Sequence, residues 1–199
     1  MSYPIPESTL ETRLEVKKSV FHACAGYAPD RDAAMNLLAE CKGRYPDARH
    51  HCWAYVTGHP LSATSAAMSD DGEPAGTAGK PIFNVLQHKG VGDVMVVVSR
   101  YFGGVKLGSG GLVRAYSAAT QQTMQQLPTV QQVQLTNCTL RCDFKHEQYL
   151  RLWTEQHHGH IRQCEYGAQV TMHLALPQQA VTQLDGLLAS LNDAVRIRE

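Results

Sequence analysis

The chain has 199 residues, of which 43% are hydrophobic and 18% charged, and its 18 basic and 18 acidic side chains give a formal net charge of zero. These values are typical of a globular protein with one or two domains, and the net charge excludes a generic cationic coat for nucleic acid. No apolar run approaches the ~20 residues of a membrane helix, and the acidic, proline-broken N-terminus is unlike a signal peptide. We therefore expect a cytoplasmic protein with no membrane partner.

The first seventy residues combine strand and helix patterns. Alternating apolar positions predict one or two strands between residues 8 and 28. Asp30 is a typical N-cap for a helix, which the spacing of apolar side chains extends to about Cys41. Two more strands are expected at residues 50–57 and 63–68, so strands and helices are mixed along the chain.

The segment from Ser69 to Ala119 is the most distinctive part of the chain. Ten of the 16 glycines lie between Gly72 and Gly111, so the backbone geometry is specified most tightly there. We therefore expect the functional site in this segment.

The same segment contains a strand between two helices. A helix is expected at residues 81–88, where Pro81 suits the first turn. Residues 93–99 are apolar and rich in β-branched side chains, which predicts a strand buried on both faces. A glycine-rich loop follows, and a second helix is expected at residues 112–126. A strand, a glycine loop and a helix in this order can direct backbone N–H groups at an anion.

A second domain is expected after a glutamine-rich stretch around Pro128. The proline ends the preceding helix, so we place the boundary there and expect domains at residues 1–127 and 130–199. The second domain shows a βαββαβ pattern, which is the ferredoxin-like order. Its elements are expected at residues 130–142, 146–157, 161–165, 169–176, 178–191 and 194–198.

The cysteines and histidines form no clear metal or catalytic pattern. None of the six cysteines belongs to a Cys-x-x-Cys pair, and we expect reduced, buried thiols. Cys138, Cys142 and His146 suggest zinc, but a strand running into a helix would not place them on one helical face. The scattered histidines, among them His50, are expected to be surface or structural residues.

Three ligand or nucleophile motifs each lack one or two of the residues that they require. A phosphate-binding Walker A loop would need glycine in place of Pro74 and a hydroxyl in place of Pro81. A dinucleotide loop would need a third glycine where Val113 stands. A nucleophile elbow at Ser109 lacks its first glycine, because Leu107 occupies that position, and Ser109 is more typical of a helix cap.

Three acidic residues, Asp70, Asp71 and Glu73, are weak candidates for a metal site. Carboxylates this close together can hold magnesium beside a phosphate. A tight Asp-Asp-Gly turn, or a salt-bridge network with Lys80, Lys106 or Arg114, explains them equally well. No metal or other cofactor is expected.

Basic residues are concentrated in the same segment. Five of them stand between residues 80 and 114 against Asp93 alone, which leaves a local charge of +4. The Arg100-Tyr101-Phe102 sequence adds aromatic rings that could stack on RNA bases, although both rings could also belong to the core. A solvated mixed surface is the alternative to a phosphate-binding patch. The candidate anion- or nucleic-acid-binding residues are Lys80, Arg100, Gly103, Gly104, Lys106, Gly108, Ser109, Gly110, Gly111 and Arg114.

The segments DDGEPAGTAGKPI and VVVSRYFGGVKLGSGGLVRAYSAA resemble the signature of the IMPACT family. The resemblance implies an N-terminal domain like the second domain of ribosomal protein S5, also similar to domain IV of elongation factor G. It implies a ferredoxin-like C-terminal domain similar to domain V of that factor. The eukaryotic members act in translational control by binding the activator of a kinase that senses amino-acid starvation, and the family supplies no agreed reaction for bacterial members.

The sequence therefore predicts an α+β protein of two domains that binds RNA or the ribosome and takes part in the regulation of translation. Charge and geometry indicate only that the ligand is an anion, and its identification as RNA rests on the resemblance to the family. One alternative is an enzyme that acts on a phosphorylated small molecule or nucleotide. Another is a protein-protein interaction module that docks a partner through its C-terminal domain without nucleic acid.

Overall fold

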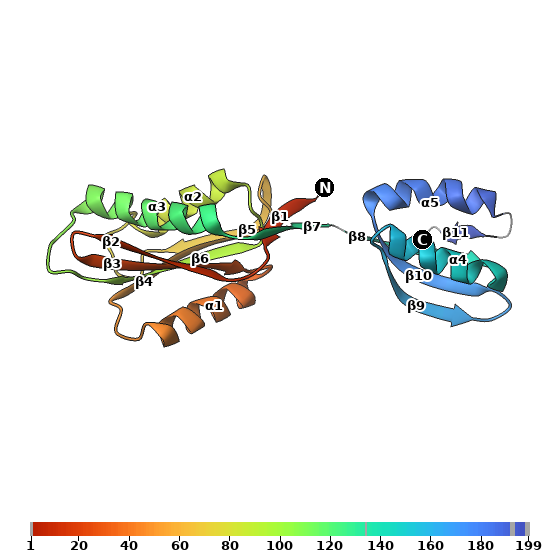
Figure 1. The fold of residues 1–199 in the computed structure, drawn as a ribbon, viewed down its shortest axis with the longest axis horizontal. Coiled ribbons are helices and arrows are strands. Elements are labelled where there is room, and N and C mark those ends of the chain that lie inside the picture. Colours follow the sequence, from red (N-terminus) through yellow and green to blue (C-terminus); the bar gives the residue numbers. More distant parts are fainter. Residues whose placement is uncertain (1, 134, 192–193, 198–199) are drawn as a thin grey trace. The chain divides into compact units, whose positions relative to one another are not determined.

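The computed structural model describes residues 2–133, 135–191 and 194–197 and has a mixed α+β fold (Figure 1). The chain divides into two compact units. One unit is Tyr3–Gln132, and the other contains Ser2 and the described residues from Val133 on. The division falls a few residues after the expected boundary at residues 127–130.

A five-stranded antiparallel sheet forms the centre of the first unit. Its strands, in spatial order, are β2 (Leu10–Val16), β3 (Ser19–Tyr27), β6 (Val94–Tyr101), β4 (His50–His59) and β5 (Ser62–Ser69). The central strand β6 is buried on both faces, and residues 94–98 have no exposed surface. This confirms the expectation from its β-branched run.

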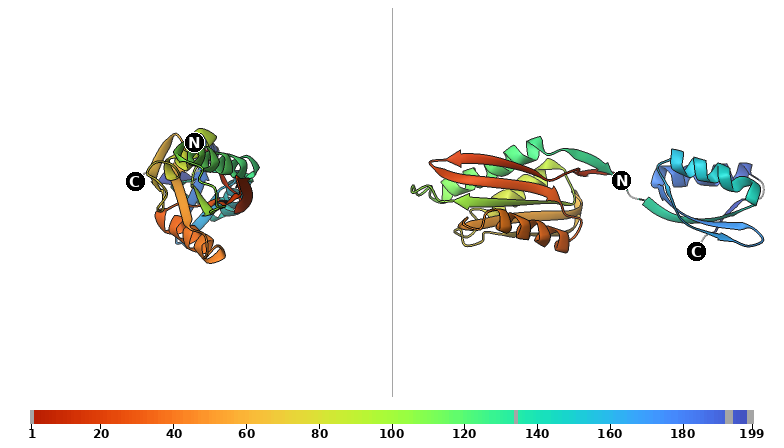
Figure 2. Two further views of the ribbon diagram at one scale, coloured as in Figure 1. Left: turned by 90° about the vertical axis from the view of Figure 1, so that its left-hand side faces the viewer. Right: turned by 60° about the horizontal axis from the view of Figure 1, so that its bottom comes forward.

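Helices cover both faces of this sheet (Figures 1 and 2). Helix α1 (Arg31–Arg44) lies on one face, where its apolar side chains pack on Met95 and Val97. Helices α2 (Gly79–Lys89) and α3 (Ser109–Gln126) lie on the other face, in the core cluster that contains Val96 and Val98. The Asp30 N-cap of α1 is confirmed, because its Oδ1 accepts a 2.8 Å hydrogen bond from the N–H of Ala33.

The strand expected at residues 130–142 is two strands in the structure. Strand β7 (Thr129–Gln132) pairs with β1 (Tyr3–Pro6), and Ile5 lies opposite Val130. Strand β8 (Leu135–Cys142) belongs to a different sheet. Because β7 pairs with β1, the residues that follow α3 remain in the first unit, and the division falls after Gln132.

The second unit has the expected ferredoxin-like order. Its four-stranded antiparallel sheet has the order β11-β8-β10-β9, and its apolar core includes Cys138, Cys142 and Leu150. The end of the last expected strand, Arg198, lies outside the described residues. The remaining elements are α4 (Phe144–Gln156), β9 (His160–Tyr166), β10 (Val170–Pro177), α5 (Gln178–Ser190) and β11 (Val195–Ile197).

All six cysteines are free thiols, and five of them are buried. Helix α4 begins at Phe144, so Cys138 and Cys142 lie on β8 while His146 lies on the helix. None of the helices that the structure describes is long and apolar enough to cross a membrane.

The turn before α2 depends on the carboxylate of Asp70. Its Oδ1 accepts hydrogen bonds from the N–H groups of Ala78 (3.0 Å) and Gly79 (2.8 Å), and its Oδ2 accepts one from Gly76 (2.8 Å). Burial raises the pKa of Asp70, but the three N–H groups outweigh it and hold the pKa below its usual value. Asp70 therefore fixes the turn and satisfies amides at the start of the helix.

We expect Asp70→Asn to lower the free energy of unfolding at pH 7 by about 1–2 kcal/mol, because the amide nitrogen cannot accept the bond that one carboxylate oxygen accepts. Since the folded-state pKa is depressed, this contribution is present above the unfolded-state pKa and is lost as the pH falls through the folded-state value. Denaturant unfolding of both proteins between pH 7 and pH 3 measures it. Asp47→Asn, at an exposed position, is the control, and an equal loss in both variants would contradict this role.

The glycine-rich loop begins with a close backbone approach at Gly103. A Cβ atom there would overlap the carbonyl of Lys18 and the N–H of Ser19, in the turn between β2 and β3. The Gly103 N–H donates a 3.2 Å hydrogen bond to Ser19 Oγ. The β2–β3 turn therefore fixes where the loop leaves the sheet.

We expect Gly103→Ala to destabilise the protein by about 1–3 kcal/mol, because the methyl group forces two backbone segments apart. Gly110→Ala is the matched control, since a Cβ there meets only Arg114 Nη1 at 3.6 Å, and its effect should stay within about 0.5 kcal/mol. Thermal and denaturant unfolding compare the two. Equal stabilities would show that the loop is not fixed at this point.

Candidate functional site

A cleft of about 410 Å³ lies in the first unit, where β6 ends and the glycine-rich loop begins. One wall is the turn at residues 72–74, and another is the loop from Lys106 into the first turn of α3. Arg49 and His50, at the start of β4, and Phe102 also line it. The cleft therefore lies in the segment where the sequence predicts the site.

Arg100 and Glu73 form a buried ion pair that lines the cleft. The two residues are 6% and 8% exposed, and Arg100 Nη1 donates a 2.5 Å hydrogen bond to Glu73 Oε1. The hydroxyl of Tyr116 on α3 donates to the same oxygen at 2.9 Å. A buried charge is tolerated when it is paired and hydrogen-bonded, so this network fixes the turn, the strand end and α3 relative to one another.

One polar atom of this network is left without a partner. Arg100 Nε is buried, and no hydrogen-bond acceptor reaches it within the part of the chain that the structure describes. Buried donors are nearly always satisfied in folded proteins. Arg100 is therefore held by Glu73 on one nitrogen and unsatisfied on another.

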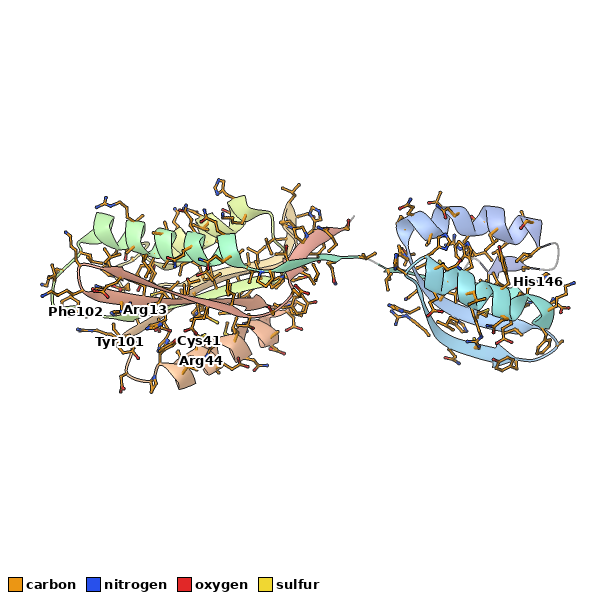
Figure 3. The ribbon with its side chains drawn as sticks, viewed as in Figure 1. Arg13, Cys41, Arg44, Tyr101, Phe102 and His146 are labelled. Atoms are coloured by element: carbon orange, nitrogen blue, oxygen red, sulfur yellow. The ribbon has the colours of Figure 1, made fainter. Side chains whose placement is uncertain are left out.

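Arg100 also lies between two aromatic rings. Its Cζ is 5.6 Å from the ring centroid of Phe21 in the core and 5.8 Å from that of Phe102. Phe102 is 46% exposed, so the possibility that it belongs to the core is wrong. Tyr101 follows Arg100 on β6, and its side chain points to the opposite face of the sheet (Figure 3). Its ring lies near those of His22 and Tyr45. Phe102 therefore presents an open aromatic ring at the cleft.

Helix α3 begins at the cleft with free backbone donors. It starts at Ser109 rather than at the expected residue 112, and Gly108, with a φ of 70°, is its N-cap. The N–H of Leu112 donates to Gly108 O at 2.9 Å, while those of Ser109, Gly110 and Gly111 have no partner among residues 2–133, 135–191 and 194–197. Ser109 is therefore the first helical residue, and its expected role as the cap is wrong. Three N–H donors and the positive end of the helix dipole remain available to a ligand.

The structure separates the cations that the sequence groups together. Lys106 and Arg100 line the cleft, whereas Lys80 on α2 and Arg114 on α3 are exposed outside its lining. Among the loop glycines, Gly108 lines the cleft, while Gly103 and Gly104 shape the path of the loop, the latter with a φ of 83°.

Arg49 and His50 were not candidates from the sequence. Arg49 directly precedes β4 and His50 is its first residue, and the antiparallel pairing of β4 with β6 places His50 opposite Arg100. The signal that could have identified them is this strand register, which no local pattern contains. Neither Arg49 nor Lys106 has an ion-pair partner among the described residues, so both charges remain available.

The three acidic residues before α2 make internal bonds. Asp70 binds the three backbone N–H groups described above, Asp71 Oδ2 accepts a 2.6 Å hydrogen bond from the N–H of His51, and Glu73 pairs with Arg100. The cation of the salt bridge is therefore Arg100, and not Lys80, Lys106 or Arg114. The described residues contain no group of three His, Cys, Asp or Glu side chains that could hold a metal ion.

Comparison with known proteins gives the same picture of two domains. The Impact N-terminal domain matches residues 17–124, which include the whole cleft, and a domain of unknown function, DUF1949, matches residues 140–191. The IMPACT family member YigZ of Escherichia coli (strain K12) is 38% identical over 191 residues, which cover 96% of this chain and 94% of that protein. An IMPACT family member of Haemophilus influenzae is 38% identical over 174 residues, with 87% and 84% covered.

The fold has a counterpart among solved structures. A crystal structure described as that of a hypothetical protein is 36% identical, has a TM-score of 0.77, and is matched over 97% of its length by 100% of this chain. The family domain spans more than half of the chain, and its relatives match nearly end to end. The chain therefore belongs to the IMPACT family.

Proposed function

We propose that this protein binds RNA through the cleft at the start of α3 and acts on the translation machinery. The observation that carries the proposal is that one cleft contains two unpaired cations, Arg49 and Lys106, and the open ring of Phe102. Ser109 also lines this cleft, and it begins the first turn of α3, where the N–H groups of residues 109–111 are free. RNA offers a partner for each of these groups, since its phosphates are anions and its bases have faces that stack.

The division of roles follows from the geometry. The N–H groups of residues 109–111 point out of a helix N-terminus, where a phosphate oxygen is favoured by both hydrogen bonds and the helix dipole. Phe102 rests on the guanidinium of Arg100 with one side and is half exposed, which leaves it available for a base. Phosphate and base contacts thus lie within a single cleft.

The link to translation rests on the family. IMPACT proteins are linked to the regulation of translation, and this chain belongs to that family. An RNA of the translation machinery is the partner that agrees with both this link and the chemistry of the cleft. The internal bonds of Asp70, Asp71 and Glu73 leave no free carboxylate set for a metal-assisted reaction, which favours binding over catalysis.

We expect the double variant Arg49→Ala with Lys106→Ala to weaken binding of single-stranded RNA by about tenfold or more, because two phosphate contacts are lost. The slope of log K against log salt should become shallower by about 1.4, at roughly 0.7 per phosphate contact. Fluorescence anisotropy with a labelled RNA between 50 and 300 mM salt measures both quantities.

The control is Lys80→Ala with Lys89→Ala, which removes the same number of charges from α2, outside the lining of the cleft. Its affinity and salt slope should stay close to those of the wild type. If both double variants lose affinity equally, RNA is bound by diffuse charge and the cleft is not the site.

We expect Phe102→Ala to weaken RNA binding by about 1–3 kcal/mol without changing the salt slope, because a stacked base is lost while the phosphate contacts remain. Phe144→Ala is the matched control, since that ring is 51% exposed on the other unit. The same anisotropy titrations compare them. If only Phe144→Ala lowered the RNA affinity, the base would not stack on Phe102 and its contact would lie outside the cleft.

A further inference from the structure

Part of the lining of the cleft is a buried ion pair. Its lining includes Arg100 and Glu73, which are less than a tenth exposed and are tied to each other and to Tyr116. A group that enters between Lys106 and the turn at residues 72–74 meets this buried pair. An internal phosphodiester has a nucleotide on both sides, and both would have to fit beside the buried pair. A terminal phosphate has a nucleotide on one side only, so a chain end reaches the pair more easily.

The charge of the cleft fits a doubly charged group. Glu73 is neutralised by Arg100, so the charges that face a ligand are those of Arg49, Lys106 and the positive end of α3. A phosphate monoester carries about −1.5 to −2 near pH 7, and an internal phosphodiester carries about −1. Two cations and a helix N-terminus therefore match a monoester more closely.

The free donors near the cleft favour a group with many acceptor oxygens. The N–H groups of Ser109, Gly110 and Gly111 have no partner among the described residues, and Arg100 Nε is a buried donor without an acceptor. A terminal phosphate has three unesterified oxygens, one more than a phosphodiester. A bound acceptor would also explain why a buried arginine is left incompletely satisfied.

On these grounds we infer that the cleft receives the terminal phosphate of an RNA strand, with the adjoining base on Phe102. This inference rests on the proposed RNA binding and narrows it to a chain end. The phosphate contacts the N–H groups of the first turn of α3 together with Lys106 and Arg49. The shared chemistry of the ligand is a phosphate monoester next to an aromatic base, and it can come from a 5′ end, a 3′ end or a free mononucleotide.

The test compares RNAs of one sequence, about ten nucleotides long, that differ only at their ends. One carries a 5′-phosphate, one a 3′-phosphate, and one has hydroxyl groups at both ends. We expect one phosphorylated RNA to bind at least about tenfold more tightly than the RNA with two hydroxyl ends, because it adds charge inside a partly desolvated site. A nucleoside monophosphate and inorganic phosphate, used as competitors, should displace it only at much higher concentrations.

Ser109 offers a matched pair of variants for the same measurement. Ser109→Glu places a carboxylate at the first helical position, where it suits the helix dipole but occupies the phosphate site. Ser109→Gln has the same length without the charge. We expect the ratio of affinities for phosphorylated and unphosphorylated RNA to fall to about one in Ser109→Glu and to persist in Ser109→Gln, with thermal stability preserved in both.

The outcomes separate this inference from the proposed function. If all three RNAs bind with one affinity and the cleft variants still weaken them, RNA binding stands and the terminal-phosphate site is overturned. If no RNA binds, both are overturned. If the mononucleotide competes as well as the phosphorylated RNA, the RNA chain contributes nothing and the ligand is a free nucleotide, which overturns the RNA assignment.

Discussion

The ion pair between Arg100 and Glu73 is the constraint on which the site depends. It joins the end of the central strand to the turn before α2, and Tyr116 ties α3 to the same carboxylate oxygen. Removing one partner of a buried pair would leave an uncompensated charge, at a cost of about 3–5 kcal/mol. The interaction therefore does more than add stability, because it positions three walls of the cleft that come from distant parts of the chain.

The position of the glycine loop follows from contacts at both of its ends. Gly103 passes so close to the β2–β3 turn that no side chain fits, and Gly108 adopts a positive φ just before α3. Between them the chain changes from a strand in the sheet to a helix packed on it, and Tyr116 anchors that helix on the ion pair. The free N–H groups of residues 109–111 are thus held in place by the fold rather than by a ligand.

The sequence predicted local features well and distant pairings poorly. The buried strand β6, the N-cap at Asp30 and the ferredoxin-like order were readable because burial on two faces, capping and periodicity leave signals within a few residues. Arg49 could not be found in this way, because only the register between β4 and β6 brings it to Arg100. The partner of Glu73 was likewise hidden, since 27 residues separate the two charges.

The same distinction explains why the cations divide into two groups. Along the sequence Lys80, Lys106 and Arg114 form a single basic patch, yet only Lys106 lines the cleft. Arg100 lines it as well, but its charge is largely cancelled by Glu73, so its contribution to a ligand is one N–H donor and a support for Phe102. The local charge of +4 that the sequence shows between residues 80 and 114 is therefore larger than the positive charge that the cleft presents to a ligand. The specificity of the cleft comes from a few oriented donors beside an open ring, not from the density of basic residues.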